Sequence, residues 1–158
     1  MTETPLTLPK AGDGDRNLAL INYALLFASL FFLGVPGLIA VLIAYSQRDA
    51  MTGVLRRHYD SQIGIFWVAF ALGIVGTIAG VWAGMMGVSQ LIHFGLDHLD
   101  AWEGFAYDDS EVRIDGGLIA LVMIAAISWL LMAAWLLFAP AIGFIRLATE
   151  RRIGDGAA

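Results

Sequence analysis

The sequence predicts an all-α, polytopic integral membrane protein. Hydrophobic residues make up 59% of the 158 residues and charged residues only 15%, so the chain is far more apolar than a soluble domain. The apolar residues gather in three runs, 18–45, 63–92 and 116–145, and no Asp, Glu, Lys or Arg interrupts any of them. Each run is long enough to cross a hydrocarbon core of about 30 Å. We therefore expect one helical membrane domain over residues 18–146.

Short polar segments flank this domain. The first 17 residues carry charges of both signs and contain Pro5 and Pro9, which discourage regular structure. We expect residues 1–17 to form a flexible N-terminal tail and residues 147–158 to form a C-terminal tail.

The first apolar run would be about 42 Å long as one helix, which exceeds the thickness of the hydrocarbon core. A break is predicted at Gly34-Val35-Pro36-Gly37, because Pro36 lacks a backbone donor and disfavours helix at Val35. Two interpretations fit: one kinked span, giving three spans in all, or a hairpin, giving four helices. We favour the kinked span, because each half alone is short for a crossing.

The loops between the apolar runs differ in charge. The segment 46–62 is basic, the segment 93–115 holds seven carboxylates against Arg113, and the C-terminal tail is again rich in arginine. Basic loops stay on the cytoplasmic side of membranes. We expect a multi-pass protein of the bacterial inner membrane, with 46–62 and the C-terminus in the cytoplasm and 93–115 outside. The arginines concerned are Arg48, Arg56, Arg57, Arg146, Arg151 and Arg152.

The second apolar run carries a row of glycines separated by three, four, four and three residues, which places them on one face of a helix. Small residues on one face let another helix approach closely, as in a glycine zipper, although such a row can also line a passage for a small solute. We favour helix packing. The glycine stripe consists of Gly73, Gly76, Gly80, Gly84 and Gly87. A partner surface is expected on the last run, from Ala126, Ala133, Ala134, Trp129 and Trp135.

Composition argues against several functions. The absence of cysteine removes thiolate catalysis and Cys-ligated metals, and the absence of charge inside the runs argues against ion-coupled transport. A net charge of −5 without a clustered basic face argues against nucleic acid. No catalytic or nucleotide-binding motif is present. We expect no enzyme activity, no catalytic residues and no cofactor.

Two polar clusters flank the second run. The inner cluster fits contact with lipid headgroups or a protein partner, because arginines attract phosphates and tryptophan anchors the interface; its members are Arg56, Arg57, His58, Gln62 and Trp67. The outer cluster, His93, Asp97 and His98, has the residue types of a metal site. The favoured interpretation of the outer cluster is an amphipathic interfacial helix.

A family resemblance rests on residues 23–67. The broken first run ends in Gly37-Leu-Ile-Ala-Val-Leu-Ile-Ala-Tyr45 and is followed by Arg48-Asp49 and then by His58-Tyr59-x-x-Gln62-x-x-x-Phe66-Trp67. This pattern resembles a family of small, uncharacterised bacterial membrane proteins that is distantly similar to the Tic component of the chloroplast import channel. Gly64-Ile65 departs from the pattern. The resemblance implies a multi-helix inner-membrane protein, with translocation as a distant analogy.

These observations predict a non-catalytic accessory or structural subunit that packs in a larger membrane assembly. Its expected partners are membrane lipid and other membrane protein subunits or further copies of itself. The alternative is a homo-oligomeric, channel-like or translocation-related protein.

Overall fold

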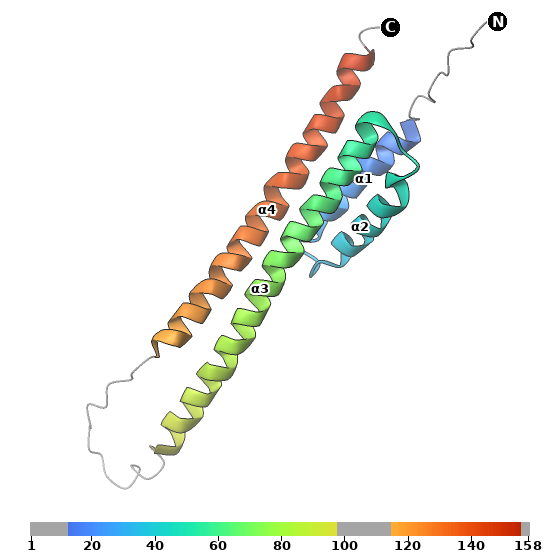
Figure 1. Ribbon diagram of the computed structural model, residues 1–158. Coiled ribbons are helices and arrows are strands. Elements are labelled where there is room, and N and C mark those ends of the chain that lie inside the picture. The colour runs from blue at the N-terminus through green and yellow to red at the C-terminus, as the bar shows by residue number, and fades with distance from the viewer. Residues whose placement is uncertain (1–12, 98–114, 156–158) are drawn as a thin grey trace, which may run out of the picture. The chain divides into compact units, whose positions relative to one another are not determined.

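The computed structural model describes residues 13–97 and 115–155, and within these ranges the chain forms four helices and no strand (Figure 1). These are α1 (Asp13–Ala28), α2 (Val35–Arg48), α3 (Gly53–Asp97) and α4 (Gly116–Asp155). The predicted all-α fold class is confirmed.

The chain divides into two compact units. The hairpin unit contains α1, α2, α3 as far as Ala69 and α4 from Ala133 onwards. The two-helix unit contains the remainder of α3 and α4 within residues 70–132.

Helices α3 and α4 are both long and apolar enough to span a membrane. They contain 45 and 40 residues, or about 67 and 60 Å of helix. In their most apolar windows only 22% and 6% of the residues are buried inside the protein. Most of their apolar side chains therefore face outward, unlike those of a helix in the core of a soluble protein.

The first apolar run forms a helical hairpin, so the favoured prediction of a single kinked span is wrong and the alternative with four helices is the one observed. The chain reverses where Leu33 and Gly34 adopt left-handed backbone conformations, with φ of 50° and 80°. The Gly34 N–H donates to the Ser29 carbonyl at 2.9 Å, as in the C-terminal cap of a helix. Helix α2 then packs back along α1 (Figure 1).

Pro36 starts a helix instead of kinking one. It lies in the first turn of α2, where its missing N–H removes no hydrogen bond and its fixed φ suits the helix. Gly37 follows on the buried side of α2, and a Cβ built there would lie 3.1 Å from the Ser29 Cβ. This glycine lets the two arms of the hairpin approach closely.

The helices extend beyond the apolar runs in both directions. Helix α1 begins at Asp13 inside the expected N-terminal tail, α3 begins at Gly53 inside the expected loop 46–62, and α4 continues to Asp155. Helices extend past an apolar run when polar residues suit their ends or when they find tertiary contacts, and Asp13 and Asp15 favour a helix N-terminus. The expected tail over 1–12 and the acidic loop over 98–114 lie outside the described residues.

Candidate functional site

The glycine stripe is used unevenly within the two-helix unit. A Cβ built on Gly76 would lie 2.8 Å from Trp129 Cδ1 and 3.2 Å from Ser128 Cβ. One built on Gly73 would lie 3.2 Å from Met132 Sδ, and one on Gly80 would lie 3.8 Å from the Ala125 Cβ. Helix α4 therefore packs closely on the first three glycines of the stripe.

The last two glycines of the stripe have no such neighbour. A Cβ built on Gly84 or Gly87 would meet nothing described within 4 Å. Gly84 instead lines a shallow hollow of about 590 Å³, together with Val81, Met85, Val88, Ser89, Ile92 and His93 of α3.

The surface of α4 that meets the stripe differs from the expected one. It contains Ala125, Ser128, Trp129 and Met132, which are spaced by three, one and three residues and so share one helix face. Of the predicted alanines, Ala126 and Ala134 are exposed. Only Trp129 among the predicted residues contacts a glycine of the stripe, because helical periodicity admits several faces and only packing selects one.

A buried pair of amides joins the helices of the hairpin unit. Asn22 Nδ2 of α1 donates to Gln62 Oε1 of α3 at 2.7 Å and to the Ala40 carbonyl of α2 at 2.9 Å. Gln62 Nε2 donates in turn to the Ala19 carbonyl at 3.0 Å. Both side chains are fully buried, and these bonds pair the Asn22 Nδ2 group and both polar atoms of the Gln62 amide inside an apolar bundle. Among the described residues, Asn22 Oδ1 has no hydrogen-bond partner.

A second contact joins α1 to α3 and α4. The hydroxyl of Tyr23 lies 3.0 Å from His58 Nδ1, and the two rings meet edge to face. The Tyr23 ring lies against the backbone of Gly143, and a Cβ built there would overlap the ring. Tyr23 is almost fully buried, so Gly143 provides space that no other residue would leave.

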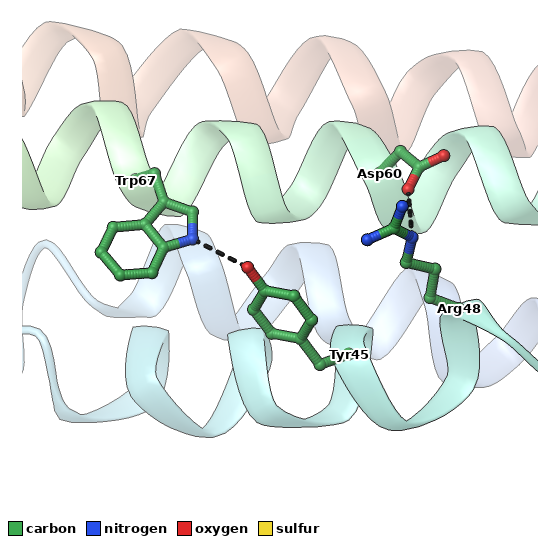
Figure 2. Close-up of polar contacts among 4 residues, drawn as sticks. All are labelled: Tyr45, Arg48, Asp60 and Trp67. Atoms are coloured by element: carbon green, nitrogen blue, oxygen red, sulfur yellow. Dashed lines mark hydrogen bonds and ion pairs between the residues drawn. The ribbon is translucent and has the colours of Figure 1, made fainter.

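Two further contacts fasten α2 to α3, and Figure 2 shows both. Arg48 Nε lies 2.9 Å from Asp60 Oδ1, and the Trp67 indole donates to the Tyr45 hydroxyl at 3.0 Å. All four side chains are partly or largely exposed, as expected for the outer surface of a bundle.

The predicted inner cluster is thus divided between different roles. Gln62 is buried in the amide pair, His58 contacts Tyr23, and Trp67 contacts Tyr45. Arg56 and Arg57 are exposed on the first turns of α3. These two arginines face the surroundings of the bundle and are available to a ligand or a lipid.

The predicted outer cluster lies at the end of α3. His93 is exposed, Asp97 is the last residue of the helix, and His98 lies outside the described residues. Within 13–97 and 115–155 there is no group of three or more residues that could hold a metal ion.

Sequence reasoning missed how the polar groups pair. Asn22 and Gln62 are both amides in apolar surroundings, and each needs a partner inside a bundle. That need was visible in the sequence, but the separation of 40 positions between them was not. Nor did the sequence indicate that Gly143 leaves space for the Tyr23 ring, because a single glycine in an apolar run does not show which side chain will pack on it.

Comparison with protein-family models, with curated proteins and with solved structures gives no match to this chain. The resemblance carried by residues 23–67 therefore remains an expectation.

Proposed function

We propose that the chain is a non-catalytic membrane protein that acts as a packing subunit of a larger membrane assembly. The main support for this proposal is that α4 packs on only part of the glycine stripe. Gly73, Gly76 and Gly80 receive α4, whereas Gly84 and Gly87 continue the same face without a described neighbour. A bare helix backbone in lipid favours close approach by another helix, so a further helix from a partner subunit fits this second part of the stripe.

The proposed topology has two spans, α3 and α4, and a re-entrant hairpin formed by α1 and α2. The hairpin is too short to cross twice, since α1 and α2 contain 16 and 14 residues, or about 24 and 21 Å of helix. Its tip exposes Phe31, Phe32 and Leu33 at 66, 65 and 98%. An apolar tip of this kind is stable in hydrocarbon and unfavourable in water.

The backbone of the tip also suits hydrocarbon. The amides of Phe32, Gly34 and Val35 donate to carbonyls within residues 28–32. A turn that pairs its own amides avoids much of the cost of placing irregular backbone at membrane depth. This topology places three segments on the cytoplasmic side: the N-terminus, residues 49–52 and the C-terminus. The acidic segment 93–115 lies on the opposite side of the membrane.

Copurification tests the packing function. Tagged protein is extracted from its native membrane in mild detergent, and proteins present in fixed ratio are identified by mass spectrometry. We expect a stoichiometric membrane partner that Gly84→Leu and Gly87→Leu each remove. Gly64→Leu is the matched control, because Gly64 lies on α3 in the hairpin unit and is also free of close neighbours.

Either of two results would contradict the packing function. One is a partner retained in full by both stripe variants. The other is a pure homo-oligomer that carries solute or ion flux in liposomes, which would establish the channel-like alternative.

Cysteine labelling tests the topology, and the natural chain contributes no background because it contains no cysteine. A membrane-impermeant maleimide added to intact cells should label Asp109→Cys. It should label Asn17→Cys and Thr149→Cys only after permeabilisation. Labelling of Asn17→Cys from outside would disprove the re-entrant hairpin.

A further inference from the structure

Arginines from all four helices lie at about the same height along the hairpin unit. Helices α1 and α3 run in the same direction in this unit (Figure 1). Asn22 of α1 donates to Gln62 of α3. Arg16 precedes Asn22 by six residues, and Arg56 precedes Gln62 by the same number. Arg16 and Arg56 therefore lie at about the same height on neighbouring helices.

Contacts bring the other arginines to the same height. Arg48 at the end of α2 lies 2.9 Å from Asp60, one turn after Arg56. Arg16 donates to the Leu147 carbonyl of α4 at 3.1 Å, and Arg146 is the preceding residue. We call this set the arginine belt: Arg16, Arg48, Arg56, Arg57 and Arg146.

The members of the belt have two different tasks. Arg16 and Arg48 make contacts within the bundle, since Arg16 donates to the Leu147 carbonyl and Arg48 pairs with Asp60. Arg56, Arg57 and Arg146 are exposed, and none of the three takes part in an ion pair within the described residues. Three guanidinium groups from two helices are thus directed to the surroundings.

The surface next to the belt has the character of a membrane interface. Trp67 lies on α3 about two to three turns beyond Arg57 and donates to Tyr45, and both rings are about half exposed. Exposed Trp and Tyr mark the boundary between hydrocarbon and headgroups. In the proposed topology, the arginines lie on the polar side of this boundary.

We propose that the arginine belt binds the phosphate groups of anionic phospholipids through Arg56, Arg57 and Arg146. The guanidinium group donates paired hydrogen bonds in a fork that matches phosphate geometry. Arginines next to a membrane also gain from the negative potential of anionic lipid. This inference rests on the proposed membrane location, but not on any protein partner.

The test compares lipid binding to purified protein in detergent by native mass spectrometry, with phosphatidylglycerol and phosphatidylcholine as probes. We expect preferential binding of phosphatidylglycerol that weakens as salt is added. Each of Arg56→Gln, Arg57→Gln and Arg146→Gln should weaken it by roughly fivefold, and the triple variant by on the order of a hundredfold. The matched triple lysine variant retains the charges but loses the paired hydrogen bonds, so it should bind more tightly than the triple glutamine variant and less tightly than the wild type.

Three results would overturn the proposal: equal binding of both lipids, binding that does not respond to salt, or undiminished binding by the triple glutamine variant. Inorganic phosphate is the competing probe, and its binding as tightly as the lipid would show a site for a free anion. All variants should remain in the membrane fraction. Loss of the wild-type chain from that fraction would instead contradict the membrane location, so the two failures are distinguishable.

Discussion

The hairpin unit and the two-helix unit hold their helices together by different means. In the hairpin unit, large buried side chains such as Tyr23, Tyr59 and Leu147 fill the core, and the amides of Asn22 and Gln62 bridge its helices. In the two-helix unit, no described side chain forms a hydrogen bond between helices, and glycines allow α3 and α4 to approach closely.

The difference shows two ways to associate apolar helices. Hydrogen bonds between side chains fix which residues meet, because an unpaired amide in an apolar bundle is unfavourable. Close packing on glycines depends only on shape, so the same kind of surface can receive a helix of the same chain or of a partner. We therefore expect the helices of the hairpin unit to pair only with one another, and the glycine stripe to accept helices of different sequence.

The largest effect should come from Gly143→Ala in the hairpin unit. The added Cβ would overlap the ring of Tyr23, which is buried and held by His58, so the ring cannot move away. We expect a loss of about 1–3 kcal/mol or more in the free energy of unfolding. Thermal unfolding in detergent micelles measures it.

Gly64→Ala is the control for Gly143→Ala, because an added Cβ at Gly64 meets nothing within 4 Å. It should leave stability unchanged or slightly increased, since alanine favours helix over glycine. Equal stability of the two variants would show that α1 does not pack on α4 as described.

The amide pair should give the next largest effect. Asn22→Leu and Gln62→Leu each leave the other amide buried without its partner, and we expect each to cost about 1–3 kcal/mol. The double variant should cost less than the sum of the two single variants, because no unpaired amide remains. Chemical denaturation of the wild type, the two single variants and the double variant gives the four free energies of unfolding for a double-mutant cycle. If the loss in the double variant equals the sum of the losses in the single variants, the two amides do not pair.

A smaller effect is expected in the two-helix unit from Gly76→Ala. The added Cβ would crowd the Trp129 indole, but that side chain is 48% exposed and can rotate outward. We expect a loss of about 1 kcal/mol. Gly84→Ala, on the open part of the stripe, should be neutral or stabilising by up to about 1 kcal/mol. A loss at Gly84 equal to that at Gly76 would show that the stripe is packed along its whole length.

The smallest effect should come from Arg48→Gln, which breaks the ion pair with Asp60. Both side chains are 40% or more exposed, so water and salt screen the attraction. We expect a change below about 1 kcal/mol in the free energy of unfolding, and a smaller change at high salt. A loss as large as that of the single amide variants would show that the pair is shielded from solvent.

The amino-acid sequence by itself determined the helical class, the two long apolar helices and the glycine face. Each of these follows from local properties, since hydropathy over a window and residue spacing along a helix require no knowledge of distant neighbours. The break near Gly34 was also visible. Its form as a hairpin was not, because a proline near glycines is compatible with both a kink and a helix start.

Only the tertiary structure decided which polar groups meet and which glycines are covered. Asn22 pairs with Gln62 across 40 positions, Tyr23 occupies the space left by Gly143, and α4 covers only the first part of the glycine stripe. The height at which the arginines gather was equally hidden, because they come from four helices. Such relations depend on the register between helices, which is set by packing of the whole bundle and leaves no local pattern in the chain.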